Sequence, residues 1–265
     1  MTRLGRPAWV AVSLLACLAP SRVLAQRSDP PCVLDKCLQP KPDVGQDRTS
    51  APADPEQDDA PPTQPGFTPR RGGGAAGNFD FYVLALSWSP GFCATGGAQK
   101  ARDQCAPGSN LGFVVHGLWP QFTRGYPSDC GPAGRVPSRQ ALDTVDGVYP
   151  DVGLARYEWK KHGTCSGKSP TDYFADVKAA RDGIAIPPPL QRPAGDQTWA
   201  PLDVARAFVA SNQGLRTDQM AVTCRQGLLA EVRICLTKDL RSTVPCPEVA
   251  RGACRTRQIT VPGLR

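Results

Sequence analysis

Residues 115–120 read VHGLWP and residues 157–165 read YEWKKHGTC, and these two stretches hold both histidines of the 265-residue chain. The first stretch overlaps an apolar run at residues 111–118, which favours a buried strand that carries His116 toward its end. The second stretch places His162 directly before a glycine. Two histidines in such distinctive surroundings are candidates for acid–base chemistry.

The stretch around His162 has the spacing of a helix that gathers polar groups on one face. If residues 157–162 are helical, Glu158, Lys161 and His162 stand at positions i, i+3 and i+4 and share that face. Gly163 is expected to end the helix. A carboxylate, an ammonium and an imidazole would then lie within reach of one ligand.

This set of groups suits phosphodiester cleavage in RNA. One group removes the proton of the ribose 2′-hydroxyl and another protonates the leaving 5′-oxygen, and imidazole can do either near neutrality. Charge accumulates on the phosphate oxygens during the attack, and the ammonium of Lys161 would stabilise that charge more than the ground state. DNA lacks the 2′-hydroxyl nucleophile, so we expect RNA and not DNA to be the substrate.

Other runs predict an α+β domain without giving its strand order. Residues 79–88, 220–224 and 228–236 are strand-like, in addition to 111–118. A serine cap, a proline and an early aspartate open a helix at residue 169, and residues 201–211 are a further helix candidate.

The chain divides into three segments by composition. Residues 1–25 have two early arginines, a short apolar run and a small terminal residue, as in a signal peptide. Cys17 gives an alternative, a lipoprotein-like site that would tether the protein to a membrane. Residues 26–77 contain ten prolines and almost no large apolar side chains, which predicts a flexible tail. Residues 78–265 suit one folded domain.

These segments bear on charge and location. Of the net charge of +7, residues 1–25 carry +3 and residues 26–77 carry −2, which leaves +6 on the domain. That charge permits a polyanionic partner but is also compatible with an ordinary basic surface. Ten cysteines follow the signal peptide, an even number that favours disulfides and export. We expect a monomer without stable membrane insertion, secreted or periplasmic.

Both histidine stretches resemble the two active-site segments of the ribonuclease T2 family, which read His-Gly-Leu-Trp-Pro and Glu-Trp-x-Lys-His-Gly-Thr-Cys. The resemblance extends over essentially all of residues 78–265, because residues 81–93 and the last four cysteines also resemble the family. It implies an α+β ribonuclease T2-like fold, with a central, mostly antiparallel sheet packed with helices and braced by disulfides.

Carried over residue by residue, the resemblance implies that His116 and His162 are the acid–base pair. Glu158 and Lys161 would stabilise the pentacoordinate phosphorus. We favour His162 as the base in the first step and His116 as the acid, with the roles reversed when water opens the 2′,3′-cyclic phosphate. No cofactor or metal is needed. Trp119 occupies the family's base-stacking position, and stacking tolerates all four bases, so low base specificity is expected.

One position departs from many relatives, which have a third histidine where this chain has Tyr157. A phenol can donate a hydrogen bond to phosphate and so bind substrate, but it carries no positive charge. Spacing alone leaves 105 pairings open for the last eight cysteines. The resemblance to the family implies one particular set of four disulfides. The implied pairs are Cys93 with Cys105, Cys130 with Cys165, Cys224 with Cys254, and Cys235 with Cys246.

Two other hypotheses compete with a ribonuclease. A zinc hydrolase could use both histidines and a thiolate, but the even cysteine count and the absence of ligand-like spacing near the histidines argue against it. An exported binding or storage protein with the same fold would lack activity, although every residue that the chemistry requires is present. Taken alone, Trp119 could equally pack in a core, and Lys161 and Glu158 could serve only as surface charges.

Overall fold

The computed structural model describes residues 74–131 and 136–264. The expected signal peptide, with Cys17, and most of the expected 26–77 tail lie outside the described residues. The last residues of that tail are described. The backbone N–H of Gly77 donates to Cys165 O at 2.9 Å, and Gly77 O accepts from Lys238 Nζ at 3.1 Å.

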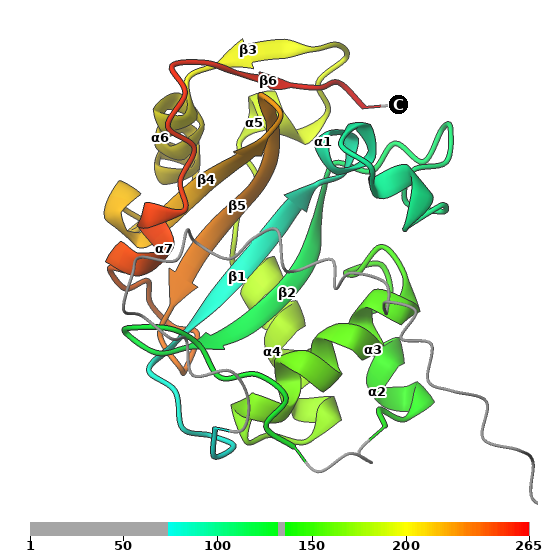
Figure 1. Cartoon of the computed structure of the whole chain (residues 1–265), viewed down its shortest axis with the longest axis vertical. Helices are drawn as coiled ribbons and strands as arrows, with labels where there is room; N and C mark the ends of the chain where they lie inside the picture. Colours follow the sequence, from blue (N-terminus) through cyan, green and yellow to red (C-terminus); the bar gives the residue numbers. More distant parts are fainter. Residues whose placement is uncertain (1–73, 132–135, 265) are drawn as a thin grey trace, which may run out of the picture. The chain divides into compact units, whose positions relative to one another are not determined.

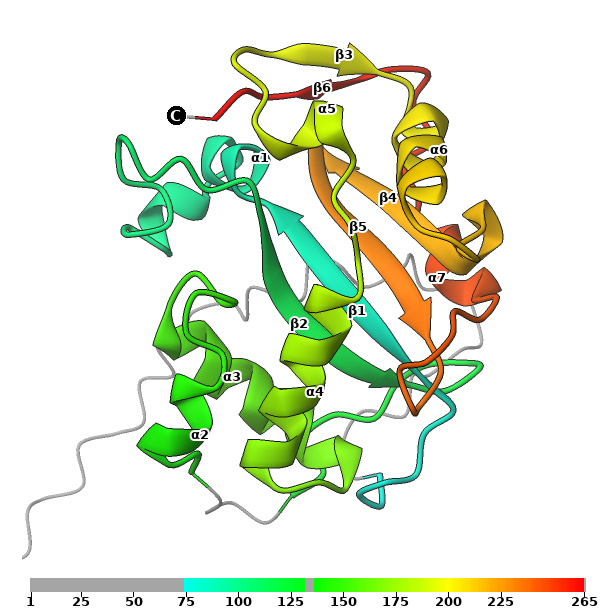
Figure 2. The same ribbon diagram turned by 180° about the vertical axis from the view of Figure 1, so that it is seen from behind.

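The described residues form a six-stranded mixed sheet flanked by helices (Figures 1 and 2). The strands are β1 (Phe81–Trp88), β2 (Phe113–Gln121), β3 (Gln197–Trp199), β4 (Met220–Arg225), β5 (Leu228–Leu236) and β6 (Ile259–Val261). The α-helices are α1 (Ser89–Ala94), α2 (Arg139–Asp143), α3 (Val152–Lys161), α4 (Pro170–Asp182), α5 (Pro188–Gln191), α6 (Pro201–Ser211) and α7 (Pro247–Arg251). Short 3₁₀ helices are η3 (Gly97–Gln99), η4 (Gly163–Ser166) and η5 (Thr217–Gln219).

The sheet has the strand order β2-β1-β5-β6-β3, with β4 also paired to β5. β1 is antiparallel to both β2 and β5, and β4 is antiparallel to β5. A single parallel pair, Leu228 with Thr260, joins β5 to β6. The expected mostly antiparallel sheet packed with helices is thus confirmed, and β2 lies at its edge.

β1 is buried along its whole length and separates two apolar clusters. Tyr82, Leu84 and Leu86 point into the main core, whereas Phe81, Val83 and Ala85 belong to a smaller cluster on the other face. The alternation follows from the two-residue period of a strand. Side chains of α3, α4 and α6 fill the main core, and Figures 1 and 2 show α3 and α4 beside β1 and β2.

The sequence predicted where the longer strands lie, but it did not predict the first and last residues of all of them correctly. The run at 111–118 becomes β2, but the strand begins at Phe113 and continues through Pro120 to Gln121. Proline has no N–H to give to a ladder and is tolerated where a strand lies at the edge of a sheet, as β2 does. The cap at Ser169 and the helix at 201–211 are present as expected.

Four disulfides brace the fold, and they are the pairs implied by the family resemblance: Cys93–Cys105, Cys130–Cys165, Cys224–Cys254 and Cys235–Cys246. All eight cysteines of the described residues are therefore oxidised, and none offers a thiolate. Among the described helices none is long and apolar enough to cross a membrane.

Candidate active site

His116 is the extra residue of a β-bulge in β2. Ala85 of β1 pairs with Gly117, and the next residue, Leu86, pairs with Val115, so the ladder skips His116. A bulge bends the strand and redirects the side chain of the extra residue. It leaves the His116 side chain 23% exposed within a strand that is otherwise mostly buried.

Two carboxylates from different elements lie next to the His116 ring. Nδ1 is 2.5 Å from Glu231 Oε1 on β5, and Nε2 is 3.8 Å from Glu158 Oε1 on α3. The contact at Nδ1 has hydrogen-bond length and the contact at Nε2 is longer. The two ring nitrogens thus face different groups.

Helix α3 delivers the second group of residues. It begins earlier than the sequence indicated, at Val152, because the side chain of Asp151 caps it by accepting from Leu154 N at 2.9 Å. Glu158 is fully buried. His162 is the C-cap, and its backbone N–H donates to Glu158 O at 2.9 Å. Its side chain is also buried, so Glu158 and His162 both lie inside the protein.

Trp119 connects the two motifs. Its Nε1–H donates to Glu158 Oε2 at 2.7 Å. The centre of its ring lies 5.2 Å from that of His116 and 5.4 Å from that of His162. Trp119 is only 6% exposed, and the guanidinium of Arg233 lies 5.2 Å from its ring centre. Stacking of an RNA base on Trp119 remains a prediction, and it requires that a ring face become accessible.

Glu231 and Arg233 were not identified from the sequence. Arg233 Nε donates to Glu231 Oε2 at 2.8 Å, and both side chains are largely buried. Burial by itself raises the pKa of Glu231, but the charges of Arg233 and His116 outweigh it and hold the pKa at about 2. The sequence did contain a signal for these two residues: they are opposite charges at alternate positions of the otherwise apolar run at residues 228–236.

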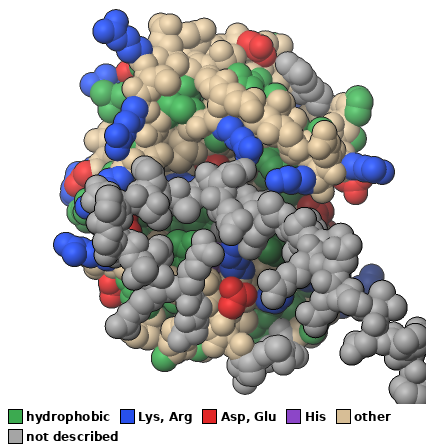
Figure 3. All heavy atoms as spheres, viewed as in Figure 1, with side chains coloured by type: hydrophobic (Ala, Val, Ile, Leu, Met, Phe, Trp, Pro, Cys, Tyr) green, Lys and Arg blue, Asp and Glu red, His purple; other side chains and the backbone are tan. Residues whose placement is uncertain are grey.

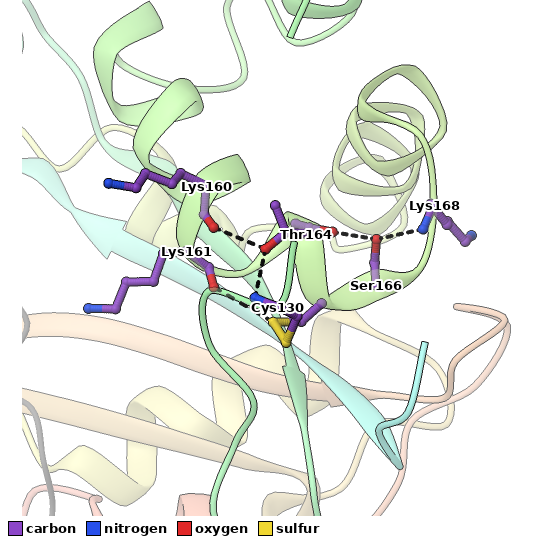
Figure 4. The surroundings of a disulfide bond; sticks show 8 residues. Cys130, Lys160, Lys161, Thr164, Ser166 and Lys168 are labelled. Carbon is purple, nitrogen blue, oxygen red and sulfur yellow. Dashed lines mark hydrogen bonds between the residues drawn. A yellow bond between two sulfur atoms is a disulfide. The ribbon is translucent and has the colours of Figure 1, made fainter. Parts of the chain in front are cut away.

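Lys161 and Tyr157 interact with each other on α3. Lys161 Nζ donates to Tyr157 Oη at 3.1 Å and lies 5.5 Å from the ring centre. Figure 4 shows that the side chains of Lys160 and Lys161 extend away from the Cys130–Cys165 disulfide. Contact of Lys161 or Tyr157 with a phosphate therefore remains a prediction.

The Cys130–Cys165 disulfide braces the segment that follows His162. The N–H of Cys130 donates to Thr164 Oγ1 at 3.2 Å, and that hydroxyl donates to Lys160 O at 3.0 Å (Figure 4). Tyr126, which was not predicted, lies 6.3 Å from the His162 ring and is 45% exposed.

Basic side chains do not gather at one place on the surface that is visible in Figure 3. Lys and Arg are spread over its described part, with Asp and Glu among them. Among the residues that the structure describes, no three His, Cys, Asp or Glu side chains are grouped to hold a metal ion. On this face the positive charge of the domain therefore acts as a general attraction for a polyanion.

Two imidazoles that contact one indole, with a buried carboxylate hydrogen-bonded to that indole, are the groups of an enzyme that moves two protons. The fold is α+β, and this site holds the groups that acid–base chemistry requires. The sequence model of the Ribonuclease T2 family matches residues 79–246, and the chain belongs to this family. It is an endoribonuclease of the T2 type.

Individual relatives agree with this assignment. The chain is 38% identical over 188 residues to a ribonuclease of Aeromonas hydrophila, with 66% of this chain and 80% of the relative covered. It is 29% identical over 194 residues to ribonuclease DdI of Dictyostelium discoideum, with 67% and 82% covered. The solved structure of RNase NT in complex with 5′-AMP has a TM-score of 0.56 at 20% identity, covering 71% of this chain and all of that one, and shows the shared fold.

Proposed function

We propose that His116 and His162 are the proton-transfer pair of this ribonuclease. The observation that carries the proposal is that the only two histidines of the chain, from separate elements, both contact the ring of Trp119. The two residues come from separate elements, 46 positions apart in the sequence, and the fold brings them to the same indole. Their common place beside a buried carboxylate supports a shared chemical role.

In the first step, His162 takes the proton of the 2′-hydroxyl while O2′ attacks phosphorus. The bond from phosphorus to O5′ breaks, and His116 gives its proton to O5′, which leaves a 2′,3′-cyclic phosphate. In the second step the roles reverse. His116 takes a proton from water, the oxygen of that water bonds to phosphorus, the bond to O2′ breaks, and His162 returns a proton to O2′. The product has a 3′-phosphate.

Glu158 and Lys161 stabilise the pentacoordinate phosphorus in this proposal. Glu158 joins the second motif to the first: its Oε1 is 3.8 Å from His116 Nε2, and its Oε2 accepts a hydrogen bond from Trp119. A buried carboxylate would repel the phosphate oxygens if it were ionised and unaccompanied, so it acts by sharing a proton or by orienting its neighbours. Lys161 supplies positive charge after leaving Tyr157, and Tyr157 can then donate a hydrogen bond to a phosphate oxygen.

The remaining elements of the proposal concern substrate and place. We propose low base specificity on single-stranded RNA, with Trp119 as a stacking surface, because an aromatic face accepts every base. The four disulfides support export to an oxidising compartment, either the periplasm or the medium. We propose a monomer that acts without a cofactor.

The decisive experiment compares two substrates in excess EDTA. His116→Ala and His162→Ala should both lose cleavage of single-stranded RNA by at least about a hundredfold, the usual scale of one proton-transfer group. On a nucleoside 3′-(4-nitrophenyl phosphate), whose leaving group needs no proton, His116→Ala should retain most activity and His162→Ala should not. Asp182→Asn, at an exposed ion pair with Lys178, is the matched control.

Each alternative gives a different pattern. If His162→Ala retains activity on the activated substrate and His116→Ala loses it, the base and acid are exchanged. Loss of wild-type cleavage in EDTA would point to a metal site. A correctly oxidised protein that cleaves neither substrate would support a binding or storage role, and cleavage of matched DNA would exclude the 2′-hydroxyl mechanism.

A further inference from the structure

The side chain of Glu231 contacts the nitrogen of His116 that faces away from Glu158. Glu231 Oε1 is 2.5 Å from Nδ1, while Nε2 faces Glu158 Oε1 at 3.8 Å. Because Glu231 is largely buried, water competes little for this contact. We propose that Glu231 is the positioning residue of His116: by accepting from Nδ1–H it keeps Nε2 as the nitrogen that exchanges protons with RNA. This inference rests on the proposed role of His116.

Arg233 holds the Glu231 carboxylate in the orientation that accepts from His116 Nδ1–H. Its Nε and its terminal Nη2 each lie 2.8 Å from Glu231 Oε2, so Oε2 is held by Arg233 while Oε1 points to the imidazole. The pKa of about 2 keeps Glu231 ionised, and an ionised carboxylate only accepts hydrogen bonds. Nδ1 must therefore carry a proton, and the lone pair of neutral His116 lies on Nε2.

The strand pairing makes this arrangement rigid. β5 is antiparallel to β1 in register, with Ser87 opposite Glu231 and Ala85 opposite Arg233. The bulge that exposes His116 lies on the other side of β1, between the partners of Ala85 and Leu86, and so beside the same part of the strand. β1 thus sets the separation between His116 and its carboxylate. A site held on paired strands is more precise than one held on loops.

Within the part of the chain that the structure describes, β5 and α3 place charged groups against His116. β5 contributes Glu231 and Arg233, and α3 contributes Glu158. His162 lies across the Trp119 ring. Glu231 is the carboxylate in hydrogen-bond contact, so removing its charge should disfavour the imidazolium form. The alkaline limb of the pH–rate profile should then move to lower pH.

The variant Glu231→Gln tests the tautomer directly. Glutamine has one carbonyl oxygen, and Arg233, which can only donate, should keep it. The amide NH₂ then faces Nδ1 and donates to it, which forces the proton of neutral His116 onto Nε2. That tautomer cannot accept a proton at Nε2, and it could give up its Nε2 proton only by becoming an imidazolate, so it serves as neither base nor acid. A carboxylate-to-amide change beside a catalytic histidine costs about 10⁴ in kcat in a serine protease for the same reason.

Two measurements on the full-length oxidised protein give the expected result. Nitrogen NMR of histidine-labelled protein, assigned with His162→Ala, should show neutral His116 protonated on Nδ1 in the wild type and on Nε2 in Glu231→Gln. Cleavage of a dinucleoside phosphate should fall by at least about a hundredfold in kcat, with KM changed less than about threefold, because orientation and not binding is lost. Asp203→Asn, at an exposed pair with Arg206, should match the wild type in both.

A second substitution guards against a merely structural effect. In Glu231→Gln with Arg233→Met, the carbonyl oxygen is released to turn toward Nδ1–H, so the Nδ1 tautomer and part of kcat should return. If the wild-type tautomer is Nε2–H, or if Glu231→Gln keeps the Nδ1 tautomer and normal kcat, the proposal is wrong. Loss of kcat that the double variant fails to restore, with an unchanged tautomer, would also overturn it.

The NMR result is independent of ribonuclease activity. If the wild type cleaves no RNA but shows the tautomer switch, the proposed function fails while the contact of Glu231 stands. If both histidine variants lose RNA cleavage and the tautomer does not switch, the proposed function stands and Glu231 has no positioning role.

Discussion

Gly117 follows His116 in β2, and the space where a side chain would begin is already filled. A Cβ at this position would lie 2.1 Å from both Glu158 Oε2 and Trp119 Nε1, the two atoms that form the hydrogen bond between the motifs. Glycine here permits β2 and α3 to approach each other. The glycine of the VHGLWP stretch is therefore required by packing.

Gly117→Ala should lose both stability and activity. Overpacking should lower the free energy of unfolding by about 1 to 3 kcal/mol, and separation of Trp119 from Glu158 should lower kcat at least about tenfold. Urea unfolding and RNA cleavage measure the two effects. Gly195→Ala is the control, since its Cβ would meet nothing within 4 Å. Equal behaviour of the two variants would show that the contact is unimportant.

The sequence identified some residues of the site and missed others for one reason. Glu158 and His162 are four residues apart on one helix, so helical periodicity was enough to group them. Glu231 reaches His116 only because β1 pairs with both β2 and β5, and that pairing is not visible in local patterns. The resemblance to the T2 family supplied the link between His116 and His162, which no spacing rule could give.

At the scale of elements, the end of α3 depends on a disulfide. His162 is the C-cap of α3, Cys165 N–H donates to His162 O at 2.9 Å, and Cys165 is bonded to Cys130. The sequence predicted a helix through His162 that ends at Gly163, whereas α3 ends one residue earlier, at Lys161, and Gly163 begins η4. It did not anticipate that η4 continues the chain as a 3₁₀ helix, because that conformation depends on the Cys130 and Thr164 contacts.

Two disulfide variants should distinguish an effect on the position of His162, measured by kcat, from an effect on the free energy of unfolding. Cys130→Ala with Cys165→Ala opens a link across 35 residues, and Cys93→Ala with Cys105→Ala opens one across 12. Chain entropy alone predicts losses of roughly 4 and 3 kcal/mol. At a temperature where both remain folded, only the first should show a lower kcat. Equal kcat values would mean that the disulfide near His162 does not position it.

At the scale of the whole molecule, the buried carboxylate of Glu231, paired with Arg233 and His116, makes stability depend on pH. The pKa of Glu231 is about 2 in the folded protein against an ordinary 4.5. Between these values the unfolded chain binds a proton that the folded protein does not, so the stabilisation is complete above about pH 5 and is lost as pH falls toward 2. The shift corresponds to about 3 kcal/mol.

A comparison of the wild type with Glu231→Gln should reveal the stabilisation that the ionised Glu231 carboxylate contributes. The difference in their free energies of unfolding, measured by urea at several pH values, should shrink by about 3 kcal/mol between pH 5 and pH 2. Other acids titrate in both proteins and cancel. A constant difference over that range would contradict the low pKa.

The fold as a whole was more predictable than its connections. Apolar runs located the four longest strands, and the family resemblance gave the sheet class and the four cysteine pairs. The three-residue strands β3 and β6 were missed, because so short a run carries no periodicity and is held by its partners. The C-terminal residues close the sheet through such contacts, as when Trp88 Nε1 donates to Pro262 O at 3.0 Å.

The bulge in β2 has a consequence for the evolution of this scaffold. His116 is the residue that the ladder between β1 and β2 leaves out, while the pairs on both sides of it keep their register. Deletion of a single codon would remove the imidazole and leave an uninterrupted ladder behind. If His116 has the proposed role, such a deletion would abolish catalysis, while the strand pairs on both sides of it and the four disulfides could still form.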